Sequence, residues 1–529
     1  MTISDLPDRV ERGDNGTLGR KHFTGRDPSH WVLAGLTLWF ALLFVLRVLH
    51  ALPLEKDEAE QLVNAQWWLA GYSGQPPLYT WLQIGVFALV GEGVIGLSLL
   101  KHLLLWSGHA AFYFAARELL PDRRLAPLAL LGLLLIPQIG WEMHRDLTHS
   151  VLVFTLASAS LWVAARWYAT GATHFYLLAG LAVGLGLLSK YNYAIFALAL
   201  LLAFLSTPNG RRRLFDRRIL LTLGIALAIV SPHLLWMLEY REDAASSLAD
   251  VGMMQTNAAL AGLGDLGRAV LSFLSPLWLA LLVLSPRGLT RSLSHGLLPG
   301  SGFPLGRFML TALGLLVLMV VFADAAEFKD RWMIPLLFVL PIQFFAFLDA
   351  GTPRRLRAFA ALTLLVPVAV TLTLLVREGT LNLPGIRPPP RPAFAELARL
   401  ATANGFDGGL IMTQGTWLAG NLLAAFPGSR ALGADANYGS TPCAPLDETL
   451  LVWNAVAGAV VPGRLARITG DVLGNVPSGF DPSYLLLLDG ERQDMEVALL
   501  RLPHGPAVDS PICRHALLPA TDVGMERLD

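Results

Sequence analysis

The sequence predicts a multipass α-helical membrane protein that ends in a small soluble α/β domain. Of its 529 residues, 54% are hydrophobic and only 15% are charged, whereas soluble domains carry about 25% charged residues. Apolar runs of the length needed to cross a bilayer, about 20 residues, follow one another as far as residue 376. The part after residue 376 has an ordinary soluble composition, which indicates a single domain outside the membrane.

Charge and hydropathy exclude two other classes of protein. The chain has 40 basic and 40 acidic residues, and its mean hydropathy is +0.52. Disordered chains combine low hydrophobicity with high net charge, so disorder is excluded. A nucleic-acid-binding domain carries a basic surface, and a pI near 7.2 argues against one.

We expect about eleven transmembrane helices, in a transmembrane region that covers residues 31–376. Each comes from an apolar run with few charges. The runs are 31–52, 94–116, 125–141, 149–169, 175–188, 191–206, 218–237, 266–285, 306–323, 332–350 and 357–376.

The distribution of arginine predicts the orientation of these spans, because short cytoplasmic loops are enriched in Lys and Arg. The basic tail 1–30 lacks the apolar core of a signal peptide, so we expect it to be cytoplasmic. Counting from there, the arginine-rich loops all fall on the cytoplasmic side if 79–91 is an interfacial helix. These loops hold Arg123–Arg124, Arg211–Arg213, Arg287 with Arg291, and Arg354–Arg355.

The opposite, extracytoplasmic face is then predicted to carry loops 53–93 and 141–148. Within 57–71, apolar residues recur at helical spacing, and we expect this stretch to lie along the membrane interface, where Trp67 and Trp68 are favourable. With Trp67, the residues that recur at this spacing are Ala59, Val63 and Ala70.

After the last span, the Pro-rich stretch 377–392 predicts a stiff linker, followed by a periplasmic soluble domain over 393–529. There we expect a helix at 393–403 and strands at 410–412, 450–453 and 483–488. The two cysteines, Cys443 and Cys513, lie in this domain, and an exported domain permits a disulfide. A bridge and two free buried thiols both remain open.

Asp57 and Glu58 form an adjacent carboxylate pair directly after the first span. Such a pair at a membrane surface can hold a hydroxyl group and accept its proton. The alternative is a solvated helix start, because acidic residues in a first turn stabilise the helix dipole.

A family resemblance adds to this interpretation. The carboxylate pair is followed by an amphipathic stretch and then by Gly74, Pro76, Pro77 and Leu78 before an interfacial helix. Further matches are Gly-Leu-Gly-Leu-Leu-Ser-Lys at 184–190 and the segment 328–342. In this order the motifs resemble the GT-C glycosyltransferases of family 39, of the protein mannosyltransferase and aminoarabinose transferase type. More narrowly, residues 31–376 are similar to bacterial lipopolysaccharide galacturonosyltransferases.

The resemblance implies transfer of a sugar from a polyprenyl-phosphate carrier at the outer face of a bacterial inner membrane. The acceptor would be lipid A, core oligosaccharide, another polysaccharide or a protein. It implies inverting displacement with Asp57 as general base and Glu58 helping to position it. Lipid phosphate can be stabilised by cations without a nucleotide-type metal site. The substrate-binding candidates are Gln75, Pro76, Pro77, Arg145, Lys190, Lys329 and Arg331, although each cation has snorkelling at the interface as its alternative role.

Two positions depart from the family pattern. Gln75 stands where aminoarabinose transferases have a lysine that contacts the donor phosphate. His149 stands where relatives have an aspartate, and Asp146 lies three residues earlier. On one helix these two would share a face, and either is a catalytic candidate. An Asp–His pair can bind a divalent metal, but two ligands are too few to predict one, and no cofactor is required.

The main rival hypothesis is a transporter or flippase. Transporters place ionisable residues at mid-membrane and are often built from repeated halves. In this sequence the charges gather at one face and we find no repeat, which favours chemistry at the membrane surface. The expected partners are the lipid-linked donor, the envelope acceptor and membrane lipids, with no nucleic acid.

Overall fold

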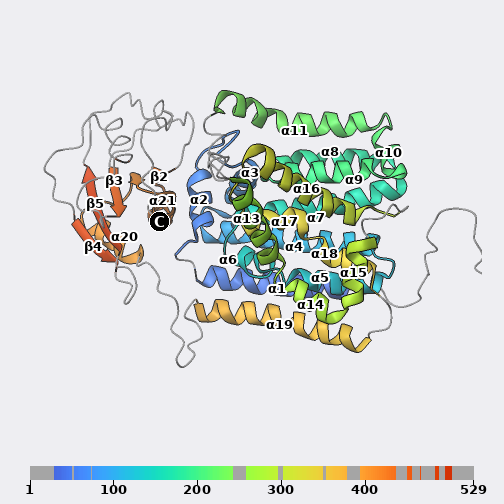
Figure 1. The fold of residues 1–529 in the computed structure, drawn as a ribbon. Helices are drawn as coiled ribbons and strands as arrows, with labels where there is room; N and C mark the ends of the chain where they lie inside the picture. The colour runs from blue at the N-terminus through green and yellow to red at the C-terminus, as the bar shows by residue number, and fades with distance from the viewer. Residues whose placement is uncertain are drawn as a thin grey trace, which may run out of the picture.

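The protein is a bundle of helices with a smaller sheet-containing unit against one end (Figure 1). The computed structural model describes residues 29–50, 53–72, 74–241, 258–295, 302–348, 353–377, 394–435, 449–454, 465, 483–487 and 495–502. The predicted N-terminal tail, the Pro-rich linker and both cysteines lie outside the described residues, apart from Ser29, His30 and Arg377 at their edges.

The first half of the bundle runs from the first predicted span to the loop after α9. Short and broken helices alternate with long ones. Its elements are α1 (Ser29–Leu49), α2 (Lys56–Asn64), α3 (Leu78–Val90), α4 (Val94–Leu119), η1 (Arg123–Leu125), α5 (Ala126–Leu133), η2 (Gln138–Glu142), α6 (Met143–Arg145), α7 (Thr148–Thr170), α8 (Thr173–Leu187) and α9 (Tyr193–Leu205).

The second half of the bundle completes the core around α4 and α7. Its elements are α10 (Pro208–Leu214), α11 (Ile219–Glu239), α13 (Ala258–Leu274), α14 (Leu277–Leu284), α15 (Pro286–His295), α16 (Leu305–Ala323), η3 (Asp330–Met333), α17 (Ile334–Leu337), α18 (Leu340–Ala346) and α19 (Pro353–Arg377).

Each of the eleven predicted runs falls on a helix or on a group of broken helices. Among the described residues, five single helices are long and apolar enough to cross a membrane, and three bent pairs raise the number to eight. The protein is therefore a multipass membrane protein, and the total of about eleven crossings stays a prediction.

Small residues set the distance between α8 and α11. A Cβ atom at Gly180 would lie 2.8 Å from the Thr222 carbonyl oxygen, and one at Gly184 would lie 2.9 Å from the Ile229 Cβ. Glycines spaced by four residues let two membrane helices approach closely. The loop after α8, which carries Lys190, is thereby held against the rest of the bundle.

The C-terminal unit consists of α20 (Phe394–Ala403), α21 (Thr416–Ala425) and a five-stranded sheet. The sheet has the order β2-β1-β3-β5-β4, with β1 parallel to β2 and β3, and β5 antiparallel to its neighbours. The predicted helix and strands coincide with α20, β1, β3 and β4, whereas α21, β2 and β5 were not predicted. The strands are β1 (Leu410–Thr413), β2 (Arg430–Gly433), β3 (Thr449–Asn454), β4 (Ser483–Leu487) and β5 (Met495–Leu502).

The amphipathic pattern led us to expect the apolar face of α2 on the membrane interface, but this face packs against the C-terminal unit. Ala59, Leu62 and Val63 belong to one buried cluster with Leu418 and Leu422 of α21. The helical pattern is confirmed for residues 57–64, which have one covered apolar face, whereas residues 65–71 lie beyond the end of α2. The cover is the C-terminal unit, because folding brings residues more than 350 positions later onto α2.

Figure 1 places α2 and the C-terminal unit at one end of the bundle, and α10 and α15 toward the other. The helix α10 carries Arg211–Arg213 and α15 carries Arg287 and Arg291. The predicted arginine-rich and carboxylate-rich faces are thus separated along the bundle axis. We refer to the end that carries α2 as the α2 end.

Candidate active site

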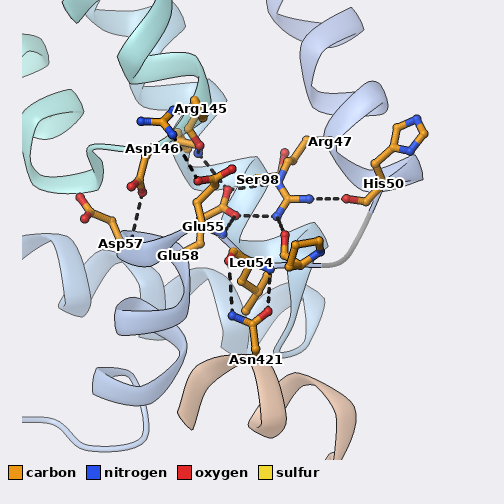
Figure 2. Close-up of polar contacts among 12 residues, drawn as sticks. Arg47, His50, Leu54, Glu55, Asp57, Glu58, Ser98, Arg145, Asp146 and Asn421 are labelled. Atoms are coloured by element: carbon orange, nitrogen blue, oxygen red, sulfur yellow. Dashed lines mark hydrogen bonds and ion pairs between the residues drawn. The ribbon is translucent and has the colours of Figure 1, made fainter. Parts of the chain in front are cut away.

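Asp57 and Asp146 lie close together (Figure 2), and each carboxylate caps the helix start next to the other residue. The Asp57 backbone N–H donates to Asp146 Oδ1 at 3.0 Å. The Thr148 backbone N–H donates to Asp57 Oδ2 at 3.0 Å. Both N–H groups belong to first turns, where they lack intrahelical partners. The exchange fixes the start of α2 against the start of α7 and orients the Asp57 carboxylate.

The backbone between Asp146 and Thr148 takes an unusual conformation. Leu147 has φ 67° and ψ 46°, in the left-handed region. For a residue with a Cβ this region costs about 1–2 kcal/mol. The turn that joins the two caps is therefore held by its surroundings, and Leu147 itself is buried.

Glu58 is held in a buried ion-pair network rather than beside the Asp57 carboxylate (Figure 2). Its Oε2 accepts from Arg47 Nη2 at 2.6 Å, and its Oε1 accepts from Lys101 Nζ at 2.9 Å. Burial alone would raise the pKa of Glu58, but the Lys101 and Arg47 charges outweigh burial and hold that pKa well below its usual range. Through these ion pairs Glu58 joins α2 to α1 and α4.

Lys101 also reaches the loop that carries Asp146. Its ammonium donates to the Arg145 carbonyl oxygen at 3.0 Å, and its side chain is 1% exposed. Lys101 therefore links the two segments that hold the cross-capped aspartates.

The Arg145 guanidinium faces carboxylates of the protein. It lies 2.8 Å from Glu142 Oε2 and 3.8 Å from Glu55 Oε2. Glu55 also pairs with Arg377 at the end of α19. This places Arg145 in a surface ion-pair group beside α2, and its predicted contact with substrate stays a prediction.

His149 is fixed as a neutral ring by a chain of hydrogen bonds. Thr80 Oγ1 donates to Gln61 Oε1 at 2.8 Å, which leaves the Gln61 amide nitrogen to donate to His149 Nε2 at 3.2 Å. His149 Nδ1 then donates to the Ser189 carbonyl oxygen at 3.4 Å. The ring connects α2, α7 and the loop that precedes Lys190.

Lys190 lies in the loop between α8 and α9, where its Nζ donates to Ser150 Oγ at 2.8 Å. Burial, followed by the charges of Arg331 and Lys329, lowers the pKa of Lys190 to about 8, and Asp57 and Glu60 act in the opposite sense. Arg331, Lys329, Asp57 and Glu60 are therefore within electrostatic range of Lys190.

The turn that contains Gln75 brings α3 to the same loop. The backbones of Tyr72 and Gln75 exchange two hydrogen bonds, and Pro76 and Pro77 are buried behind them. Pro77 is the N-cap of α3, and the next backbone N–H, of Leu78, donates to the Leu188 carbonyl oxygen at 3.1 Å. Two prolines suit this position because a helix start needs no donor there.

Lys329 is the N-cap of η3, and Arg331 lies within η3. Lys329 Nζ lies 5.8 Å from the centroid of the Trp332 ring, and the Asn192 amide donates to the Trp332 carbonyl oxygen at 3.1 Å. Asn192 follows Lys190 by two residues, so this hydrogen bond holds the two cationic segments together.

Glu60 is a further candidate site residue that the sequence analysis did not name. Burial and the nearby carboxylates of Asp57 and Asp435 raise the pKa of Glu60 to about 8. It follows Asp57 by three positions on α2, a spacing that places both on one helix face. That spacing was readable in the sequence.

Lys101 and Arg47 were also missed. Lys101 interrupts an otherwise apolar run, and an ionisable residue inside a span is by default a candidate for function or for a buried pair. The same reasoning that selected Lys190 would have selected Lys101.

In the part of the chain that the structure describes, no group of three His, Cys, Asp or Glu side chains is placed to hold a metal ion. The candidate site thus combines carboxylates on α2 and in the loop before α7 with cations on the loop after α8 and at η3.

A multipass bundle with buried carboxylates on α2 and before α7 is consistent with the GT-C type membrane glycosyltransferases that the sequence resembles. The chain is 35% identical to the lipopolysaccharide core galacturonosyltransferase RgtB of Rhizobium johnstonii, over 81% of this chain and 87% of that protein. It is 32% identical to RgtA of the same organism, over 82% and 90%. The chain therefore belongs to this family of glycosyltransferases, which decides against the transporter hypothesis.

Two further comparisons agree with this assignment. Residues 74–236 match the dolichyl-phosphate-mannose-protein mannosyltransferase family. The crystal structure of ArnT from Cupriavidus metallidurans bound to undecaprenyl phosphate superimposes with a TM-score of 0.58 at 14% identity, covering 90% of this chain and 98% of ArnT. The fold is thus shared along nearly the whole chain.

Proposed function

We propose that this protein transfers a galacturonosyl residue from a polyprenyl-phosphate donor to a lipopolysaccharide core acceptor, at the periplasmic face of the bacterial inner membrane. The names of RgtA and RgtB supply the sugar and the acceptor, and the lipid bound to ArnT supplies the carrier class. We also propose that the chain crosses the membrane about eleven times and that the C-terminal unit lies outside the cytoplasm.

The observation that carries the proposal is the setting of the Asp57 carboxylate. One oxygen accepts from the Thr148 N–H, and among the described residues no hydrogen bond is recorded for the other. That oxygen is available to an acceptor hydroxyl. A general base must reach the proton it removes by a hydrogen bond, and Asp57 can do so without breaking a cap.

In the proposed step, Asp57 takes the proton of the acceptor hydroxyl as the oxygen bonds to the anomeric carbon of the donor. The bond from that carbon to the phosphate oxygen breaks, and the lipid phosphate leaves with the electron pair. Lys190, Lys329 and Arg331 stabilise this anion electrostatically. Three cations also suit a donor that carries both a phosphodiester and a uronic carboxylate.

Replacing Asp57 tests the proposal. In Asp57→Asn the side-chain carbonyl can still accept from Thr148, while the basic oxygen is lost, so we expect transfer to fall by about 10²–10⁴-fold. The assay follows mass gain of the core oligosaccharide with synthetic polyprenyl-phosphate galacturonate. Asp407→Asn, in an exposed loop of the C-terminal unit, is the matched control. Full activity of Asp57→Asn would remove Asp57 from the base role.

A further inference from the structure

The helix that carries Asp57 is held at its start by a side-chain amide of the C-terminal unit (Figure 2). The Leu54 N–H donates to Asn421 Oδ1 at 2.8 Å, and Asn421 Nδ2 donates to the Leu54 carbonyl oxygen at 3.3 Å. Trp417 Nε1 donates to the same carbonyl at 2.9 Å. Leu54 and Asn421 are both fully buried, so these hydrogen bonds cannot be exchanged for water without cost.

A second side-chain amide holds the segment just after α2. Here the amide belongs to the α2 segment and the backbone groups belong to the C-terminal unit. Gln66 Nε2 donates to the Ala431 carbonyl oxygen at 2.9 Å, and the Ala431 N–H donates to Gln66 Oε1 at 2.9 Å. Ala431 is a buried residue of β2. The two amide clamps, Asn421 on Leu54 and Gln66 on Ala431, therefore enclose α2 from both ends.

Between the clamps, α2 and α21 are in direct backbone contact. A Cβ atom at Gly420 would lie 2.4 Å from the Ala59 carbonyl oxygen. Backbone oxygen cannot move aside as a flexible side chain can, so Gly420 permits this approach only because it lacks a Cβ. Ala59, Leu62 and Val63 are buried on this contact.

The opposite side of α2 is held by the bundle. Glu58 binds Arg47 and Lys101, and Asp57 exchanges caps with Asp146 and Thr148. A helix of nine residues is too short to be stable alone. The position of α2 therefore depends on both the C-terminal unit and the bundle. Neither set of contacts involves Lys190 or Lys329.

We propose that Asn421 and Gln66 are positioning residues for the Asp57 base, so that the C-terminal unit is part of the catalytic machinery. This rests on the proposed function of Asp57. The clamps fix the register of α2 along its axis, and the Asp57 cap geometry follows from that register. Misplacement of a reacting group by about 1 Å can cost about 10²-fold in rate.

The test uses the full-length protein in detergent with Asn421→Ala and Gln66→Ala, and with Arg399→Ala as control. Arg399 is an exposed residue of α20 in the same unit. We expect kcat to fall by about 10- to 100-fold in both clamp variants, with KM for polyprenyl-phosphate galacturonate changed by less than about two-fold. The control should keep both values. Hydrogen–deuterium exchange should become faster in residues 54–66 of the clamp variants only.

Gly420→Ala provides a second variant that removes no hydrogen bond. Its methyl group would force α21 away from Ala59, and we expect the same selective fall in kcat. Thermal unfolding confirms that each variant is folded. Unchanged kcat in all three variants of an active wild-type protein would overturn the positioning role. Unchanged exchange in 54–66 would overturn it as well. Absence of transfer by the wild type would instead count against the proposed function, and the exchange result would still decide whether the clamps hold α2.

Discussion

At the scale of single residues, Asp57 and Asp146 differ in how their carboxylates are used. Asp146 is the more buried of the two, and burial together with the charge of Asp57 raises its pKa to about 7. Its Oδ1 accepts from the Asp57 backbone. These features suit a cap that can carry a proton, whereas Asp57 is left with an oxygen for the acceptor.

Asp146→Asn separates these roles. The asparagine oxygen can still accept from the Asp57 N–H, so the start of α2 should be retained and transfer should remain within about ten-fold of wild type. Asp57→Asn should fall far below that range. The measurement is kcat for both variants at pH 7 under saturating donor. A loss in Asp146→Asn as large as that in Asp57→Asn would identify Asp146 as the base.

Lys190 predicts an alkaline limit to donor binding. Because burial and Arg331 lower its pKa to about 8, the ammonium is present below that pH and is lost as pH rises through it. Facing groups are Arg331, Lys329, Asp57 and Glu60. Of these, Glu60 also has its pKa raised to about 8, so the substitution of Lys190 itself is needed to assign the effect.

We therefore expect KM for the donor to rise above about pH 8 in the wild type. In Lys190→Arg, whose charge persists to much higher pH, the rise should move to more alkaline values. Lys56→Arg, on the exposed side of α2, serves as control and should follow the wild type. A pH profile of KM that is identical in Lys190→Arg would contradict the assignment of Lys190 to donor binding.

At the scale of elements, the Glu58 network decides where α2 sits on the bundle. Removing one partner of a buried ion pair leaves the other charges uncompensated and costs about 3–5 kcal/mol. Glu58 and Lys101 are 2% and 1% exposed, so solvent cannot take over that role.

Glu58→Gln should accordingly lower the unfolding midpoint in detergent and speed hydrogen exchange in α2 and in the loop before α7. Glu396→Gln, which breaks the exposed pair with Arg399, should leave the midpoint unchanged, because exposed pairs contribute little. Equal effects of the two substitutions would show that the Glu58 network does not anchor α2.

The sequence was informative about elements and much less so about contacts between them. Hydropathy located the helices, and the Asp57–Glu58 pair indicated the candidate site, because both depend on local patterns. The Gln66–Ala431 clamp joins residues 365 positions apart, and a lone glutamine carries no periodic signal. For the same reason the pattern of α2 could not tell a covering domain from a membrane surface.

At the scale of the whole molecule, the separation of α10 and α15 from α2 makes orientation testable. Glu92 lies in the exposed turn between α3 and α4, and Arg212 is exposed on α10. In a background with serine at Cys443 and Cys513, a membrane-impermeant maleimide should label Glu92→Cys in intact spheroplasts. It should label Arg212→Cys only after lysis. Reversed labelling would place the site in the cytoplasm.

The clamp on Ala431 also bears on whether the C-terminal unit stays monomeric in solution. The strand β2 lies at one edge of the sheet, and open sheet edges pair readily with other chains. Gln66 occupies the backbone groups of Ala431 on that strand, and the apolar side of α2 covers α21. Expressed without the bundle, the unit would expose this strand and an uncovered helix. We expect the isolated unit to self-associate. In the whole protein, the membrane part would prevent this by covering β2 and α21.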